Sequence, residues 1–383
     1  MPRVPASLAK YLMTQSGSPE LATVADTETG STPRVWLVTG YRAGERNQII
    51  ALAEALGWHF ELKELFYRKN EFLTSLFRGS DLRGIRLAKS SPLVPPWPDL
   101  VISAGMRNEP VGRWIRKQSG GRTRLVHIGR PWARPENFDL LITTPQYRLP
   151  ERDNILHNTT TLHRVTADRL AAEADCWRSH YEQLPSPYIG VILGGNSGPY
   201  TFGIQAAARM AKQVSELARK RNASLLVTSS ARTFTRALRA FEQNLSVPYE
   251  LYRWHPGGSD NPYFGILGLS DALVVTADSV SMLSEACATG REVYMAELGG
   301  YGYPMREGST IPIDFRLSAL TYSWMMRFGH QRLSRDLRLV HRALLEQGQV
   351  AWLGDDFDKA PVQPAVSDMQ RAVMRVRSLF NLV

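Results

Sequence analysis

The sequence predicts an α/β protein that contains two Rossmann-like domains. Its 383 residues are too many for one ordinary hydrophobic core and suit two domains of ~150 to 200 residues each. Short apolar runs alternate with segments of helical spacing along most of the chain. This alternation is typical of a mostly parallel sheet covered by helices, and it restarts after a proline-rich break at residues 184–187.

The first domain is expected over residues 34–160, after a disordered segment at residues 1–33 that is rich in Ser, Thr, Pro and Ala. An apolar run at 34–39 and helical spacing at 47–56 predict a strand, a turn and a helix. Further strands are predicted where apolar runs end in small or polar residues, at 99–103, 124–128 and 139–143.

A linker at residues 161–187, which carries a helix at 167–181, leads to a second domain at residues 188–345. The strands predicted in this domain are 188–193, 224–228, 249–254, 271–276 and 292–296. The predicted helices are 203–220, 232–244, 262–268 and 279–288. Residues 346–383 form a tail, and we expect its helix at 366–379 to cross back to the first domain.

The composition excludes several classes of protein. With 43% hydrophobic residues, 21% charged residues and a formal charge of +10, the chain has a soluble globular composition that favours anionic partners. No nucleic-acid-binding motif accompanies the basic run at residues 107–134, so nucleic acid is not expected as a partner. Two cysteines without metal-ligand spacing, no signal-peptide pattern and no apolar run of membrane-spanning length predict a cytoplasmic protein.

Four loops of the second domain follow predicted strands and should lie at one edge of its sheet, where open α/β sheets bind ligands. They cover residues 194–198, 229–232, 255–263 and 278–281. Gly194 and Gly195 permit close backbone approach, and Arg232 is a candidate clamp on phosphate oxygens. The other candidate ligand-binding residues in the first three loops are Asn196, Ser197, Ser230, Asn261 and Pro262.

The fourth loop leads into a helix that starts near Ser279, and the first amides of a helix suit a phosphate or diphosphate. We therefore assign Ser279, Val280, Ser281 and Met282 to a phosphate site. Glu285 follows about one and a half turns later, where its carboxylate can accept hydrogen bonds from the two hydroxyls of a ribose. The alternative is an ordinary capped helix in which Glu285 is solvated.

In the first domain, residues 40–48 form a loop after the first strand that matches neither a P-loop nor a GxGxxG fingerprint. Arg42, Gly44, Asn47 and Gln48 are the candidate acceptor-side residues of this loop. Glu45 in the same loop and His163 in the linker are the candidate general bases. The residues predict neither a metal site nor a cofactor site.

Residues 60–89 mix aromatic and aliphatic side chains with lysines and arginines. Such an amphipathic stretch can lie on an anionic membrane surface, and it can equally be a helix that packs on the sheet with a solvated basic face. Both interpretations stay open from the sequence.

The stretch Asp271–Gly290, together with Asn261-Pro-Tyr-Phe-Gly265 and the looser motifs at 44–48 and 139–143, resembles the mitochondrial-fission "elongated mitochondria" family over most of residues 34–300. Bacterial members of that family look like glycosyltransferases of the GT-B type. The resemblance implies two Rossmann-like domains that face each other across a cleft, a nucleotide-sugar donor held by the second domain, and no required metal. Gly194 to Asn196 and Ser279 to Met282 would face the donor diphosphate, and Glu285 would hold its ribose. Arg232 and the helix dipole would stabilise the leaving group.

The leading hypothesis is a glycosyltransferase that moves a sugar from a nucleotide-sugar donor to a lipid or glycan acceptor of the cell envelope, at the cytoplasmic face of a membrane. A nucleotide-sugar epimerase is a second hypothesis, because such enzymes share the two-domain fold. A membrane-associated adaptor without activity is the third, because plant relatives in the family are associated with recruiting a dynamin-like protein to mitochondria.

Overall fold

The computed structural model describes residues 32–40, 42–68, 79–258, 260–357 and 364–382. Pro33–Val383 form one compact unit, so the domain boundaries expected from the sequence stay predictions. Of the segment at 1–33, predicted to be disordered, residues 1–31 lie outside the described residues.

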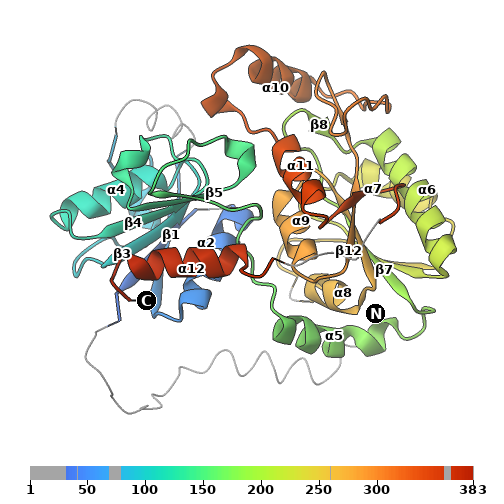
Figure 1. Cartoon of the computed structure of the whole chain (residues 1–383), viewed down its shortest axis with the longest axis horizontal. Helices are drawn as coiled ribbons and strands as arrows, with labels where there is room; N and C mark the ends of the chain where they lie inside the picture. Colours follow the sequence, from blue (N-terminus) through green and yellow to red (C-terminus); the bar gives the residue numbers. More distant parts are fainter. Residues whose placement is uncertain (1–31, 41, 69–78, 259, 358–363, 383) are drawn as a thin grey trace. The chain divides into compact units, whose positions relative to one another are not determined.

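The first sheet has six parallel strands in the order β2-β1-β3-β4-β5-β6 (Figure 1). Its strands are β1 (Val35–Thr39), β2 (Phe60–Glu64), β3 (Leu100–Ala104), β4 (Arg124–Ile128), β5 (Leu140–Thr143) and β6 (Ile155–His157). Its helices are α2 (Ala43–Leu56), α4 (Glu109–Gln118) and the short 3-10 turns η1 (Leu87–Lys89), η2 (Pro135–Asn137) and η3 (Pro145–Tyr147).

Both faces of this sheet are covered, which explains why β1 is apolar at nearly every position. Val35 and Leu37 point into a core that α2 completes, whereas Trp36 and Val38 point into a second core on the α4 side. Successive side chains of a strand alternate between faces, so a central strand with two buried faces needs a continuous apolar run. Each fully buried side chain of this kind contributes roughly 1.5–3 kcal/mol.

The second sheet also has six parallel strands, in the order β10-β9-β7-β11-β12-β14. Its strands are β7 (Tyr188–Ile192), β9 (Ser224–Thr228), β10 (Tyr249–Tyr252), β11 (Ala272–Thr276), β12 (Glu292–Ala296) and β14 (Ala351–Trp352). Its helices are α5 (Ala167–Tyr181), α6 (Ile204–Arg221), α7 (Thr235–Gln243), α8 (Tyr263–Leu269), α9 (Val280–Cys287), α10 (Leu317–Phe328) and α11 (Arg338–Glu346). The short strands β8 (Tyr200–Thr201) and β13 (Gly299–Gly300) pair separately, and η4 (Gln331–Leu333) follows α10.

The last helix, α12 (Asp368–Ser378), packs against α2 of the first sheet (Figure 1). Ala372 and Val376 are buried in the same core as Leu37. A capping box at Ser367 fixes the start of α12, since the Ser367 hydroxyl accepts from the Gln370 amide and the Gln370 side chain accepts from the Ser367 amide. The predicted return of the tail to the first domain is confirmed.

The prediction of two Rossmann-like sheets is therefore confirmed, and most predicted strands and helices match within a few residues. Two predictions for the first domain are wrong. The loop at 40–48 is instead largely the first turns of α2, which begins at Ala43 with Glu45 in its first turn, where an acidic side chain favours a helix. Tyr41 lies outside the described residues.

The second correction concerns the stretch at 60–89, where the interpretation as a helix packed on the sheet is wrong. Apart from the short 3-10 turn η1, the described part of this stretch is not helical. Its contact with a membrane stays a prediction. Phe60–Glu64 form the edge strand β2, because the alternation Phe-Glu-Leu-Lys-Glu has the two-residue period of a strand. Residues 69–78 of the stretch lie outside the described residues. Along the described parts of the chain, none of the helices is both long and apolar enough to cross a membrane.

The basic run at 107–134 is partly neutralised by the fold. Arg113 pairs with the buried Glu109 of the same helix at 2.7 Å, and Arg116 and Arg124 both pair with Asp139. This pairing weakens the run as an electrostatic footprint for nucleic acid.

Candidate functional site

The four predicted loops follow β7, β9, β10 and β11, which are parallel neighbours in one sheet, so they meet at its carboxyl edge. In the sheet, β9 and then β10 lie on one side of β7, and β11, β12 and β14 lie in that order on its other side. The point between β7 and β11 is where strand order reverses, and open α/β sheets bind ligands outside such a point. The candidate site lies there.

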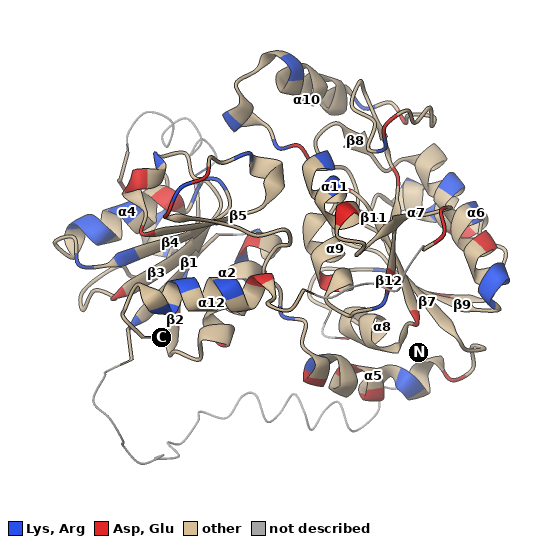
Figure 2. Ribbon diagram, viewed as in Figure 1, with Lys and Arg blue, Asp and Glu red and all other residues tan. Residues whose placement is uncertain are grey.

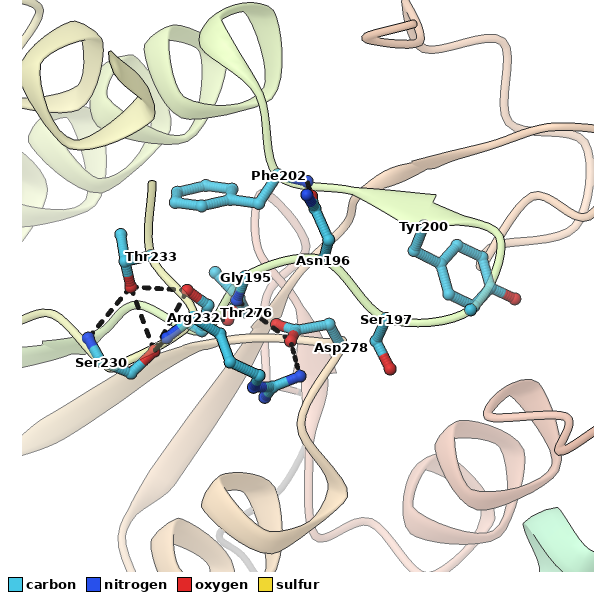
Figure 3. A network of polar contacts seen from close by, with 12 residues as sticks. Gly195, Asn196, Ser197, Tyr200, Phe202, Ser230, Arg232, Thr233, Thr276 and Asp278 are labelled. Carbon is cyan, nitrogen blue, oxygen red and sulfur yellow. Dashed lines mark hydrogen bonds and ion pairs between the residues drawn. The ribbon is translucent and has the colours of Figure 1, made fainter. Parts of the chain in front are cut away.

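Asp278, which follows β11, is the centre of the polar network at this edge (Figure 3). Its Oδ2 accepts a hydrogen bond from the Gly195 amide at 3.1 Å and lies 3.0 Å from Nη1 of Arg232. Its side chain is fully buried, and Oδ1 has no partner among the described residues. Burial raises the pKa of this carboxyl, against the opposing effect of Arg232.

The loop after β7 approaches this network through its glycines. The Gly194 amide donates to Oγ1 of Thr276 at 2.7 Å. A Cβ at Gly194 would lie 2.3 Å from Oδ1 of Asp278, and one at Gly195 would lie 2.1 Å from the carbonyl oxygen of Arg232. Glycine is therefore required for close packing of this loop on its neighbours, and both amides already have partners within the protein.

The loop after β9 is tied to the same glycine loop. The Thr233 hydroxyl donates to the Gly194 carbonyl at 2.6 Å, and the Ser230 hydroxyl contacts the same carbonyl at 3.3 Å (Figure 3). The side chain of Arg232 in this loop is substantially exposed, at 41%. Its guanidinium can thus bind a ligand while it remains paired with Asp278.

Asn196 and Ser197 hold the far end of the glycine loop. Oδ1 of Asn196 accepts from the Phe202 amide at 2.8 Å, and Oγ of Ser197 accepts from Nη2 of Arg335 at 2.9 Å. Both side chains therefore position the backbone between β7 and β8.

Helix α9 begins directly after Asp278 and presents its first turn to the site. Ser279 is the N-cap residue, and its side chain makes no capping hydrogen bond. The Ser279 carbonyl accepts the amide of Leu283 at 3.0 Å, which leaves the amides of Val280, Ser281 and Met282 with no acceptor among the described residues. Ser281 and Met282 are partly exposed. This turn offers unpaired N–H donors and the positive end of a helix dipole.

Glu285 lies further along α9 and is partly buried rather than solvated. The Tyr263 hydroxyl donates to its Oε2 at 2.5 Å, and burial raises the Glu285 pKa to about 7 despite this hydrogen bond and the nearby Arg169. Asn261 and Pro262 position Tyr263, since Oδ1 of Asn261 accepts the Tyr263 amide at 3.1 Å and Pro262 is the N-cap of α8. The other carboxylate oxygen of Glu285, Oε1, accepts no hydrogen bond from the described residues.

The candidate bases occupy different surroundings. Glu45 in α2 accepts a hydrogen bond from Arg42 at 3.2 Å, and burial raises its pKa. His163 lies beyond β6, its Nδ1 has no described partner, and burial lowers its pKa. Each shift keeps a general base functional near neutral pH, a neutral imidazole in one case and a more basic carboxylate in the other.

The candidate acceptor-side residues all belong to the start of α2. Arg42 is its N-cap residue, Gly44 and Asn47 are exposed, and the Gln48 side chain donates to the Gly44 carbonyl at 3.1 Å. A Cβ at Gly44 would lie 3.9 Å from Oγ of Ser281, which is van der Waals contact. This turn of α2 therefore lies close to the first turn of α9.

The sequence did not identify several residues that organise the site. Asp278 belongs to a predicted loop but has no predicted role, and Thr233 falls in the predicted helix at 232–244. The sequence does not connect Tyr263 to Glu285 or Arg335 to Ser197. The position of Asp278 at the carboxyl end of a buried strand was available in the sequence. The Tyr263 and Arg335 contacts required the three-dimensional fold.

A separate cavity of about 500 Å³ lies beside β12 and β14, lined by residues that include Arg209, Glu297, Arg306 and Trp352. None of the predicted site residues lines it. Within the described ranges, no three His, Cys, Asp or Glu side chains are grouped closely enough to hold a metal ion.

The family model described as "Mitochondrial fission ELM1" matches residues 43–308, which include α2, all four loops and Glu285. The chain belongs to the mitochondrial fission ELM1 family. One relative of this chain is the mitochondrial fission protein ELM1 of Arabidopsis thaliana, 29% identical over 238 residues. That match covers 56% of this chain and 55% of the plant protein, so the chain spans about half the length of that relative.

A second relative is an uncharacterized protein of Rickettsia prowazekii, 22% identical over 299 residues that cover 68% of this chain and 82% of that protein. Among solved structures, UDP-GlcNAc 2-epimerase of Methanocaldococcus jannaschii matches with a TM-score of 0.47 and 11% identity, covering 91% of this chain and 99% of that one. A glycosyltransferase of Rickettsia africae matches with a TM-score of 0.42 and 13% identity, covering 83% and 98%.

Proposed function

We propose that this ELM1-family protein is a GT-B-type glycosyltransferase that transfers a sugar from a nucleotide-sugar donor to a lipid or glycan acceptor of the cell envelope. The observation that carries the proposal is the first turn of α9. It combines three amides without described acceptors with a partly buried carboxylate, Glu285, one and a half turns away. A nucleoside diphosphate presents the groups that suit these two features, anionic phosphates for the amides and a ribose diol for the carboxylate.

The chemistry assigned to the site is stabilisation of a leaving diphosphate. As the bond from the anomeric carbon to the diphosphate oxygen breaks, negative charge grows on the diphosphate. Unpaired helix-start amides and the exposed guanidinium of Arg232 would stabilise that charge without a metal. Asp278 fixes Arg232 beside the glycine loop and so orients it toward the same place.

The acceptor would bind on the side of α2, and Glu45 or His163 would remove the proton from its hydroxyl. We place this sugar transfer in the cytoplasm, at the surface of a membrane, because an envelope acceptor is lipid-linked or membrane-borne. The identity of the sugar is open in this proposal.

The proposal is tested by calorimetric titration of the purified protein with UDP, GDP, ADP and CMP. Ser281→Glu places a negative charge on the first turn of α9, which suits the helix dipole but repels a diphosphate. We expect this variant to keep its melting temperature and to lose nucleotide affinity by at least about tenfold, whereas Ser281→Gln retains most of it.

If none of the four nucleotides binds, the donor site is refuted. A second candidate, a membrane-associated adaptor without activity, is then favoured. The specific observation for it is that the amides of Gly194 and Gly195 already have protein partners, together with the name of the plant relative, a mitochondrial fission protein. A nucleotide-sugar epimerase is separated from a transferase by product analysis, because an epimerase converts the donor in the absence of any acceptor.

A further inference from the structure

Helix α10 carries its large apolar side chains on its outer face. Leu317, Leu320, Trp324 and Phe328 are 65%, 39%, 66% and 66% exposed, whereas the small residues Ala319 and Ser323 are buried. The exposed residues follow the spacing i, i+3, i+7 and i+11, so they form one stripe along the helix. This is the reverse of an ordinary surface helix, whose apolar stripe faces the core.

Exposed apolar residues also flank the helix along the chain. Phe315, just before α10, is 75% exposed, and Leu333, in η4, is 43% exposed. Trp324 and Phe328 contact each other with their ring centroids 4.9 Å apart. We call Phe315, Leu317, Leu320, Trp324, Phe328 and Leu333 the outer stripe. An exposed apolar set of this size, with four members on one helix face, marks an interaction surface.

The chain segment that carries the outer stripe is basic. Residues 315–335 contain four arginines and neither Asp nor Glu, and α10 shows no acidic residue in Figure 2. Arg327 and Arg332 are exposed and form no ion pair with any residue that the structure describes. The Arg327 guanidinium lies 5.4 Å from the ring centroid of Phe328, which places positive charge directly beside the apolar surface.

The exposure of the outer stripe does not come from a loosely attached helix. Arg316 donates to the carbonyls of Gly198 and Tyr200 at 2.6 and 3.0 Å, and Oγ1 of Thr201 accepts from the same guanidinium at 3.2 Å. The Tyr322 hydroxyl accepts the Arg335 amide at 3.0 Å. Helix α10 is thus fixed, through its inner face, to the segment that follows the glycine loop.

We propose that the outer stripe of α10 binds the surface of an anionic lipid bilayer, with α10 parallel to the membrane plane. Trp, Phe and Leu on one face, with arginines beside them, match the boundary between acyl chains and anionic headgroups. A second copy of the chain would place Arg327 and Arg332 against the same charges, which disfavours a symmetric contact through this face. Twelve helical residues span only about 18 Å, so the helix lies on the bilayer and does not cross it.

The inference goes beyond the proposed function and does not require it, because bilayer binding by α10 needs no nucleotide. Where both hold, docking brings the glycine loop close to the membrane. Arg316 joins α10 to the backbone at Gly198, four residues after Gly194. A lipid-linked acceptor could then reach the site without leaving the bilayer.

The test is flotation of the full-length protein with vesicles of phosphatidylcholine alone or of phosphatidylcholine mixed with phosphatidylglycerol. We expect the wild type to float with the anionic vesicles only. Trp324→Ser/Phe328→Ser should lower its affinity for them at least about tenfold, because two interfacial anchors are lost. Arg327→Gln/Arg332→Gln should lower it roughly fivefold per charge, and the residual binding should lose its salt dependence.

The matched control is Phe66→Ser/Leu87→Ser, which removes two apolar side chains of the segment 60–89 that are 50% and 61% exposed. This control should float like the wild type. The proposal is overturned if the wild type fails to bind anionic vesicles, or if the control loses as much binding as the α10 variant. It is also overturned if sedimentation without lipid shows a dimer that Trp324→Ser/Phe328→Ser dissociates while vesicle binding persists.

Discussion

Arg232 and Asp278 form an ion pair, 3.0 Å from Nη1 to Oδ2, that joins the loop after β9 to the loop after β11. The same carboxylate oxygen accepts the Gly195 amide, so one buried side chain connects three loops of the candidate site. Asp278 is fully buried and Arg232 is 41% exposed. Because the buried carboxylate has lost its contact with water, the stability of the three loops depends on its pairing with Arg232.

Loss of the arginine should expose this dependence. We expect Arg232→Ala to lower the free energy of unfolding by about 1–2 kcal/mol, less than for a fully buried pair because the guanidinium is partly solvated. The double variant Asp278→Asn/Arg232→Ala should lose less free energy of unfolding than the sum of the losses in the two single variants, because it contains no unpaired charge. Urea denaturation of the two single variants and the double variant measures this coupling, and strict additivity would contradict it.

Glu285 should make the unliganded protein less stable as the pH rises. Burial raises its pKa from 4.5 to about 7. The folded state therefore holds the proton more tightly than the unfolded state, and stability falls between these two values and stays low above them. Glu285→Gln keeps an acceptor for the Tyr263 hydroxyl but cannot ionise. We expect the variant to be more stable than the wild type by on the order of 2–3 kcal/mol above pH ~7 and equal to it below pH ~4.5.

Thermal unfolding of both proteins across this pH range, without nucleotide, checks the expectation. Glu182→Gln controls for the loss of one surface charge. A constant difference between Glu285→Gln and the wild type at every pH would show that Glu285 ionises in the fold as it does in water.

Two glycine substitutions should change the free energy of unfolding in opposite directions. Gly195→Ala places a Cβ 2.1 Å from the backbone oxygen of Arg232, which cannot move without shifting the loop, so we expect a loss of about 2 kcal/mol or more. Gly44 lies in α2, and the nearest atom to an added Cβ is Oγ of Ser281 at 3.9 Å. We therefore expect Gly44→Ala to raise the free energy of unfolding by up to about 1 kcal/mol. Chemical denaturation compares the two, and equal losses would contradict the packing described for the glycine loop.

The sequence predicted the two sheets well because their strands are buried on both faces. A run such as Ala272–Thr276, fully buried in β11, is apolar whatever its neighbours are, and its polar end predicts where a loop begins. Edge elements were harder. Phe60–Glu64 carries three charged residues, and its place in the sheet comes from pairing with β1 rather than from its own composition.

Helix α10 was not predicted because its apolar stripe faces solvent and its core contact rests on Ala319 and Ser323. The candidate site was found at the level of loops but not of contacts. Gly194, Arg232 and Glu285 follow strands or a helix start, which periodicity identifies. Their partners Thr233, Asp278 and Tyr263 depend on which strands are neighbours, and strand order is not encoded in local spacing.

The protein should lose stability in mild acid because two histidines are buried as neutral imidazoles. His341 in α11 donates from Nε2 to the Ala277 carbonyl at 2.7 Å, and burial lowers its pKa from 6.5 to about 4. Burial lowers the pKa of His127, in β4, to about 3. A lowered histidine pKa means that the unfolded state takes up protons first, so stability is present above pH ~6.5 and is lost as the pH falls toward the folded pKa.

His341→Gln separates this effect from general acid unfolding. The glutamine amide can still donate to the Ala277 carbonyl but does not titrate. We expect the wild type to lose on the order of 3 kcal/mol more than the variant between pH ~6.5 and ~4, and the remaining dependence to fall further in His127→Gln/His341→Gln. Urea midpoints at several pH values give the slopes. If stability falls equally with pH in the wild type and in His341→Gln, His341 takes up its proton over the same pH range in the folded and the unfolded protein. Its contact with the loop beside Asp278 would then tolerate the charge.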